Sequence, residues 1–162
     1  ASLTARLKAA ASCETWGYPL AFHFDPLILY DGCEADYTRV IERLYSQVSA
    51  ENIVWISLGT LRFPPSIKTV IQKRFPDSKI IYAEFVKGPD GNMRYFKPLR
   101  INLYRKIVAC IRDHAPDARV YLCMEDDEVW RKSLGFIPAD VGGLPHMLDV
   151  SAAKHCHLVL GG

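Results

Sequence analysis

Apolar, β-rich runs alternate with helical periods along most of this sequence, and no other feature constrains the fold as strongly. Residues 53–58 (Ile-Val-Trp-Ile-Ser-Leu) form a continuous run, which predicts a strand covered on both faces. Residues 34–48 place apolar side chains three or four positions apart and carry acids in the first turn, which predicts a helix. Such alternation is typical of right-handed βαβ units around a mainly parallel sheet, an α/β fold.

The remaining segments fit the same scheme until the chain nears its end. We expect helices at residues 3–15, from Pro64 to Phe75, from Pro98 through the apolar positions up to Ile111, and at about 125–133. We expect further strands at residues 19–24, 79–85 and 119–124. After residue 134, glycine and proline residues interrupt the sequence, and the apolar residues follow neither a helical nor a strand-like period. The expected organisation is therefore one domain, residues 1–134, and an irregular C-terminal tail, residues 135–162.

Composition limits the classes of protein that this chain can belong to. With 162 residues, 49% of them hydrophobic, it can bury one substantial core. We expect no leader peptide, and no apolar run is long enough to cross a bilayer. Its five cysteines are odd in number and scattered, which favours reduced thiols and a cytoplasmic location. A helical pattern begins at once, without an initiator methionine, so we expect a fragment of a larger fold.

Positive charge is concentrated around one predicted hairpin. Two short apolar runs flank Pro89-Asp90-Gly91, and Asp-Gly is a strong signal for a tight turn. Residues 87–106 hold six of the 20 basic residues but one of the 18 acidic residues. Basic side chains interleaved with aromatic ones suit phosphates and unstacked bases. The alternative is an exposed hairpin whose basic edge is merely solvated and prevents aggregation.

Other candidate sites lie where the predicted strands end, because ligands of α/β folds bind there. Asp25 and Ser57 are such residues, and Gly59 would allow a close backbone approach. His23 is read as a hydrogen-bonded core residue. The acids from Glu125 to Glu128 are read as the first turn of a helix rather than a cation site. His155-Cys156-His157 lacks a second group of ligands, so no metal site is expected.

Several motifs in order resemble those of the spore photoproduct lyase family. They are residues 55–64 (Trp-Ile-Ser-Leu-Gly-Thr-Leu-Arg-Phe-Pro), residues 90–100 (Asp-Gly-Asn-Met-Arg-Tyr-Phe-Lys-Pro-Leu-Arg), and residues 121–125 followed by Glu128-Val129-Trp130. Residues 17–22 and 24–28 fit the same alignment. The resemblance runs from about Trp16 to Phe136 and is to the C-terminal half of these radical S-adenosylmethionine (AdoMet) DNA repair enzymes.

The resemblance implies a fold, a reaction and a partner. The fold would be the C-terminal portion of a partial (β/α) TIM-type barrel with a protruding hairpin, residues 84–97. The reaction would be the reversal of the methylene-bridged thymine dimer to two thymines, with AdoMet and a [4Fe-4S] cluster. The partner would be double-stranded DNA, held open by the hairpin. Arg94 and Tyr95 match the family's hairpin residues, so the resemblance implies that they project from the hairpin and bind DNA at the opened base stack. Lys97 and Arg100 would hold phosphates, and Asp25 and Ser57 would line the cofactor cavity.

The chain departs from the family in one respect. The cluster motif Cys-x-x-x-Cys-x-x-Cys is absent, so the catalytic residues and the cluster are expected upstream, in a missing N-terminal half. We expect this chain alone to bind no cofactor and to be inactive. Two alternatives stay open: a related radical enzyme with a non-DNA substrate, and a non-enzymatic α/β module that binds nucleic acid.

Overall fold

The computed structural model describes residues 1–158. Its elements follow one another as α1 (Leu3–Thr15), β1 (Leu20–Leu27), α2 (Cys33–Tyr45), η1 (Ala50–Asn52), β2 (Ile53–Thr60), β3 (Arg62–Phe63), α3 (Ile67–Arg74), β4 (Phe85–Lys87), β5 (Met93–Tyr95), α4 (Lys97–His114), β6 (Val120–Leu122), α5 (Asp127–Leu134), η2 (Pro138–Val141) and α6 (Leu144–Cys156). Within this part of the chain no helix is both long and apolar enough to cross a membrane.

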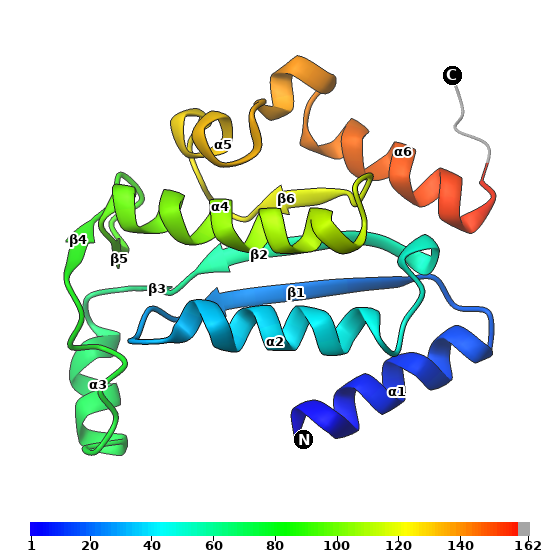
Figure 1. The fold of residues 1–162 in the computed structure, drawn as a ribbon. Helices are drawn as coiled ribbons and strands as arrows, with labels where there is room; N and C mark the ends of the chain where they lie inside the picture. The colour runs from blue at the N-terminus through cyan, green and yellow to red at the C-terminus, as the bar shows by residue number, and fades with distance from the viewer. Residues whose placement is uncertain (159–162) are drawn as a thin grey trace.

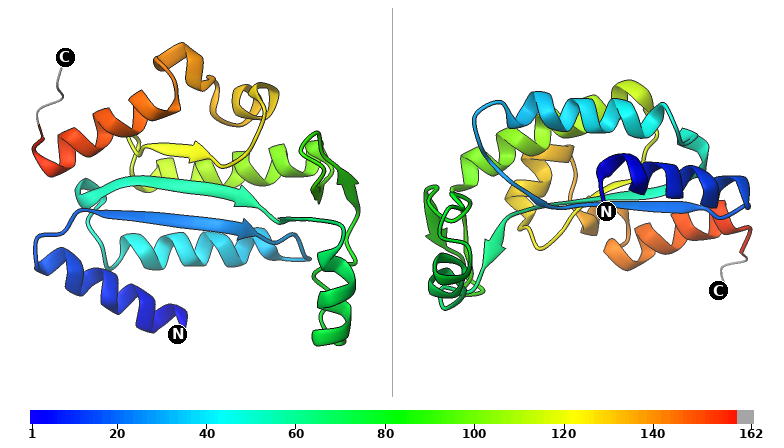
Figure 2. Two further views of the ribbon diagram at one scale, coloured as in Figure 1. Left: turned by 180° about the vertical axis from the view of Figure 1, so that it is seen from behind. Right: turned by 90° about the horizontal axis from the view of Figure 1, so that it is seen from below.

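A parallel sheet of order β1-β2-β6 forms the centre of the molecule (Figure 1). Side chains along β1 point alternately to the two faces of the sheet. Phe22 and Phe24 therefore pack on the core, while Ala21 and His23 are exposed. The helices α2 and α4 cover the core face, and Figure 2 shows the opposite face free of helices over most of its length. The mixed α/β architecture is therefore confirmed, and residues 1–158 form no closed sheet.

A second, antiparallel sheet of order β3-β5-β4 follows the end of β2. The predicted hairpin is present: Gly88 and Asn92 close it, and Gly91 adopts a φ of 81°, which glycine tolerates without strain. The strand predicted at residues 79–85 is wrong. That stretch forms turns, and β4 begins only at Phe85. Its run Ile80-Ile81-Tyr82 buries Ile81 alone, which is too little apolar burial for a strand to gain by pairing.

The predicted irregular tail is also wrong for the described residues of that region. Gly143 and Pro145 begin α6 rather than interrupting a period, because proline suits the first turn of a helix. The Ser151 hydroxyl donates to the carbonyl of Val54, and Met147 is buried. The helix α6 is thereby attached to β2, so the tail is part of the domain. Residues 159–162 lie outside the described part.

Candidate functional site at the strand ends

The carboxyl ends of the three parallel strands bring a carboxylate, a guanidinium and a thiol together. Asp25 lies in β1, Arg62 follows β2, and Cys123 follows β6, where its N–H donates to the carbonyl of Leu58. An Arg62 nitrogen lies 3.7 Å from an Asp25 oxygen and 3.5 Å from the Cys123 sulfur. Parallel strands place their ends at one edge of a sheet, which explains this convergence.

Gly59 is required at this edge because Asp25 occupies the space of a side chain. A Cβ added at Gly59 would lie 2.6 Å from the Asp25 carboxyl carbon, well inside van der Waals contact. The close approach that the sequence predicted at Gly59 is therefore made by the Asp25 side chain itself. This contact fixes the carboxylate over β2.

The thiol of Cys123 is held in its protonated form. Burial raises the pKa of Cys123 most, and the Asp25 carboxylate raises it further, while Arg62 acts in the opposite direction. A cysteine in this state is a weak nucleophile, since the thiolate is the reactive form. Cys123 therefore serves here as a hydrogen-bonding and packing partner.

Ser57 lies in the row of side chains next to this cluster. It pairs in register with His23 on β1 and Tyr121 on β6, so it lies on the face of the sheet that α2 and α4 leave uncovered. Ser57 is 1% exposed, and its hydroxyl has no hydrogen-bond partner within residues 1–158. A buried hydroxyl without a partner is rare, so Ser57 offers a free donor and acceptor beside Asp25.

A buried network fastens the hairpin to these strand ends. Arg100 donates through two nitrogens to the carboxylate of Glu125, at 2.9 and 3.0 Å, and through a third to the carbonyl of Tyr95. Tyr104 donates to Glu125 at 2.9 Å and accepts from the N–H of Thr60 at 2.9 Å. Burial raises the pKa of Tyr104, which keeps its hydroxyl protonated as a donor. The hairpin, α4, β6 and β2 are thereby joined.

The expectation that Arg94 and Tyr95 project from the hairpin is wrong. Tyr95 is 1% exposed, and its ring stacks on that of Phe85 with 4.7 Å between the ring centres. Its hydroxyl oxygen accepts a hydrogen bond from the N–H of Leu29. Arg94 is 9% exposed, pairs with Asp90 at 2.6 Å and donates to the carbonyl of Met124. The reason is that a short hairpin is not stable alone and needs an apolar face, which Tyr95 and Phe85 supply with Phe63.

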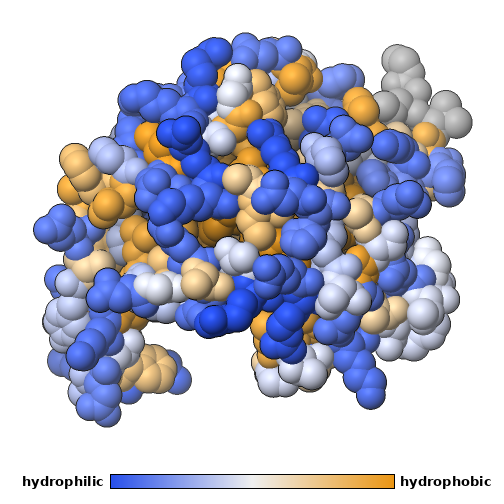
Figure 3. Space-filling model, viewed as in Figure 1, coloured by the Kyte–Doolittle hydropathy of each residue, from blue (hydrophilic) through white to orange (hydrophobic). Residues whose placement is uncertain are grey.

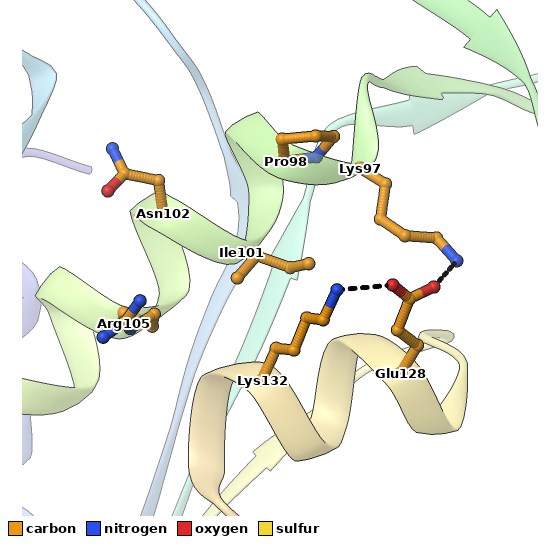
Figure 4. Close-up of a pocket in the computed structure, with 7 residues that line it drawn as sticks. All are labelled: Lys97, Pro98, Ile101, Asn102, Arg105, Glu128 and Lys132. Carbon is orange, nitrogen blue, oxygen red and sulfur yellow. Dashed lines mark hydrogen bonds and ion pairs between the residues drawn. The ribbon is translucent and has the colours of Figure 1, made fainter.

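The two predicted phosphate ligands have different surroundings. Arg100 is buried in the network described above, so no phosphate reaches it in this structure. Lys97 is half-exposed and pairs with Asp126 at 2.9 Å and Glu128 at 2.8 Å. Glu128 also pairs with Lys132, as Figure 4 shows, and these lysines lower the pKa of its carboxyl. Together they border a hollow of about 300 Å³ between α4 and α5, lined by Lys97, Pro98, Ile101, Asn102, Arg105, Glu128 and Lys132.

Within residues 1–158 no three His, Cys, Asp or Glu side chains gather in a way that could hold a metal ion. His155 instead contacts the carbonyl of Ser151 one helical turn earlier.

Sequence reasoning placed Asp25 and Ser57 at strand ends but did not identify Arg62 as the partner of Asp25 and Cys123. Glu125 follows a predicted strand, but it was read as an acid of a helix start rather than as the partner of Arg100 and Tyr104. No local signal identifies these partners, because they come from segments far apart in the sequence.

Comparison with known proteins gives a consistent result. The family model described as spore photoproduct lyase matches residues 1–121. The spore photoproduct lyase of Bacillus subtilis (strain 168) is 30% identical over 80 residues, which cover 48% of this chain and 23% of the relative. That of Geobacillus sp. (strain Y412MC61) is 31% identical over 81 residues, which cover 49% of this chain and 24% of the relative.

Solved structures agree on the fold. A spore photoproduct lyase variant with dinucleoside spore photoproduct superposes with a TM-score of 0.68 at 24% identity, covering 76% of this chain and 39% of that one. A second variant, with bound AdoMet and dinucleoside spore photoproduct, gives a TM-score of 0.65 at 23% identity, with the same coverage. The matched region thus spans well under half the length of these relatives.

Proposed function

Because the chain belongs to the spore photoproduct lyase family, we propose that it forms part of a lyase that returns the methylene-bridged thymine dimer of DNA to two thymines. The observation that carries this proposal is the uncovered strand-end face, where Ser57 and the Asp25, Arg62 and Cys123 cluster lie together. Relatives with the same fold bind dinucleoside spore photoproduct. The alternative is a related radical enzyme that has the same face but acts on another substrate. Measuring whether the intact protein converts spore photoproduct distinguishes these two functions.

The sheet is proposed to be one portion of a partial (β/α) barrel. Three features support this: the strands are parallel, α2 and α4 cover one face, and the other face carries polar side chains. In a barrel the uncovered face would point inward. The polar row would then form a wall of the central cavity.

The same wall suits AdoMet, which one related structure holds. The Asp25 carboxylate can accept from hydroxyl or amino groups. The Ser57 hydroxyl is buried in this structure, so it would donate to or accept from a ribose hydroxyl only after the side chains that cover it move. When bound, AdoMet would supply the group that removes a hydrogen atom from the lesion. This chain's part would be to bind and orient the cofactor and to exclude water.

A [4Fe-4S] cluster does not fit the residues present. The five cysteines are dispersed among different elements, and residues 1–158 hold no group of ligands. The cluster of a radical enzyme would need cysteines from another part of the protein. We therefore expect these 162 residues alone to be inactive.

The buried positions of Arg94, Tyr95 and Arg100 assign them a supporting role in holding the hairpin, residues 84–97. Lys97 remains the one of the four predicted DNA ligands that reaches solvent, so we propose that it can contact a phosphate.

The test uses the intact protein with AdoMet, reductant and dinucleoside spore photoproduct, and measures the thymidine formed. Asp25→Asn should raise the KM for AdoMet about tenfold or more, because a hydrogen bond to a charged group contributes about 1.5–3 kcal/mol. Ser57→Ala should raise it by about two- to tenfold, because a hydrogen bond between neutral groups contributes about 0.5–1.5 kcal/mol. Asp149→Asn changes an exposed carboxylate on α6 and should have no effect. Failure of the intact protein to form thymidine from this substrate would overturn the proposed function. If both variants turn over the substrate with an unchanged KM for AdoMet, Asp25 and Ser57 do not contact the cofactor.

A further inference from the structure

Residues 64–84, here called the α3 arm, stand apart from the rest of the molecule. The arm leaves the domain just after β2 and β3, and α3 contains no buried residue. Figures 1 and 2 show α3 projecting from the end of the molecule toward which the strands of the central sheet point, and Figure 3 shows the same region as a separate lobe. Ile81 is the arm's buried anchor. The arm thus lies beside the strand-end site but does not contribute to the core.

Unpaired basic side chains are concentrated on the arm. The arm carries four exposed basic side chains, and none of the four is in an ion pair within residues 1–158. They are Lys68, Lys73, Arg74 and Lys79. Elsewhere some exposed lysines have partners, as Lys106 has Glu34 and Lys132 has Glu128. Others, such as Lys8 and Lys154, are unpaired within residues 1–158 but lie far apart in the sequence, whereas the four cations of the arm lie within residues 68–79. A group of cations without internal partners attracts polyanions by long-range electrostatics.

The arm also presents two aromatic rings to solvent. Phe75 is 56% exposed and Tyr82 is 60% exposed. The Arg74 guanidinium lies 5.8 Å from the centre of the Phe75 ring, and Gln72 donates to the Tyr82 hydroxyl at 3.4 Å. These contacts orient both rings without burying them. Exposed rings next to unpaired cations are the combination that binds unstacked bases and their phosphates.

We propose that the α3 arm is a nucleic-acid-binding element that holds the sugar-phosphate backbone of DNA beside the strand-end site. Lys73 and Arg74 contact phosphates, and Phe75 and Tyr82 face bases that are exposed where the duplex opens. This proposal takes DNA as the partner and so rests on the proposed function. It also replaces the buried Arg94 and Tyr95 with side chains that DNA can reach.

A second protein surface is the competing occupant, since Val70 and Phe75 are apolar and exposed. The charge pattern favours DNA. Protein interfaces are depleted of lysine at their centre, and here cations alternate with the apolar side chains along the arm. A nucleic acid uses both kinds of side chain at once.

The experiment measures binding of the intact protein to a short undamaged DNA duplex with an opened central mismatch, without AdoMet, over a range of salt concentrations. The double variant Lys73→Gln/Arg74→Gln should bind about tenfold more weakly at low salt. The slope of log affinity against log salt should become shallower by about one for each phosphate that the variant no longer neutralises. The control variant Lys8→Gln/Lys154→Gln removes the same charge from α1 and α6 and should bind like the unmodified protein. All of these side chains are exposed, so folding is preserved, and circular dichroism checks it.

A second variant pair tests the rings. Phe75→Leu/Tyr82→Leu should weaken binding to the opened duplex but leave binding to a fully paired duplex unchanged. The proposal is overturned if the arm variant binds DNA like the unmodified protein, or if the control loses as much affinity. It is overturned in favour of a protein interface if the arm variants change only the oligomeric mass. Arm-dependent DNA binding without formation of thymidine from the dinucleoside would contradict the proposed function alone. Formation of thymidine without arm-dependent DNA binding would contradict this inference alone.

Discussion

Arg100 and Glu125 form a two-pronged ion pair that is almost wholly buried, with side-chain exposures of 3% and 4%. The pair joins the first turn of α4 to the loop after β6. Because Arg100 also donates to the carbonyl of Tyr95, the position of the hairpin depends on it. A basic residue that sequence assigned to phosphate binding is thus a structural link between the hairpin and the strand ends.

Breaking this pair from one side should destabilise the protein strongly. Arg100→Met leaves the Glu125 carboxylate buried without its cation, and we expect a loss of about 3–5 kcal/mol in the free energy of unfolding. The double variant Arg100→Met/Glu125→Leu removes both charges and should lose much less. Urea unfolding curves measure both. Equal losses in the single and double variants would contradict the account, since the penalty would not come from an unpaired charge.

Gly59→Ala should be destabilising because of one contact. The new methyl group would have to displace the Asp25 carboxyl, which lies 2.6 Å from its position. Overpacking of this kind lowers stability by about 1–3 kcal/mol. In the double variant Gly59→Ala/Asp25→Gly the space is free, so most of that loss should be recovered. Thermal unfolding of the four proteins in this cycle measures the coupling, and simple additivity would argue against a direct clash.

Local sequence determined much of the fold. The helix Leu3–Thr15 has the predicted bounds, because Ser2 caps it and Leu7 faces the core. The continuous apolar run that begins at Ile53 forms the buried central strand β2, as predicted. Asp90-Gly91 forms the expected turn. In each case the determinant lies within a few residues of the element.

Interactions between distant residues determined what sequence could not predict. Arg94 turns inward because the carbonyl of Met124, thirty residues away, accepts from it and Asp90 balances its charge. The helix α6 is secured by Ser151 and Val54, which are 97 positions apart. For the site, the three parallel strands were predicted, although β1 and β2 continue to Leu27 and Thr60 and β6 ends at Leu122. The pairing of Asp25 with Arg62 and Cys123 depends on the order of the strands. No local pattern contains that order.

Cys123 offers a probe of the strand-end cluster. Burial is the main cause of its raised pKa, Arg62 lowers it, and Asp25 raises it. Arg62→Gln should therefore slow alkylation of Cys123 at mildly alkaline pH, and Asp25→Asn should speed it. The thiolate fraction changes about tenfold for each unit of pKa. Mass spectrometry of the peptide that contains Cys123 separates it from the other cysteines. Changes in the same direction in both variants would mean that exposure, rather than charge, controls the reactivity.

Alkaline pH should weaken the fold through Cys123 as well. Its folded-state pKa is raised, so the unfolded chain loses this proton first as the pH rises. The contribution of the thiol to stability is therefore complete below the ordinary cysteine pKa and declines above it. In Cys123→Ser the free energy of unfolding should fall less steeply between about pH 8 and 10 than in the unmodified protein. Urea unfolding at several pH values measures this, and parallel curves would contradict it.

The buried hydroxyl of Tyr45 should also make stability depend on alkaline pH. Burial raises the pKa of Tyr45 from 10.0 to about 12, and its hydroxyl has no hydrogen-bond partner within residues 1–158. The unfolded chain loses this proton first, so the contribution of Tyr45 is complete below pH 10 and is lost as the pH rises toward 12. In Tyr45→Phe that loss should disappear. At neutral pH the variant should be as stable as the unmodified protein or more stable by up to about 1 kcal/mol, because no hydrogen bond is removed. Tyr18→Phe, at an exposed position, is the control, and a clear loss of stability in Tyr45→Phe at neutral pH would mean that its hydroxyl is satisfied after all.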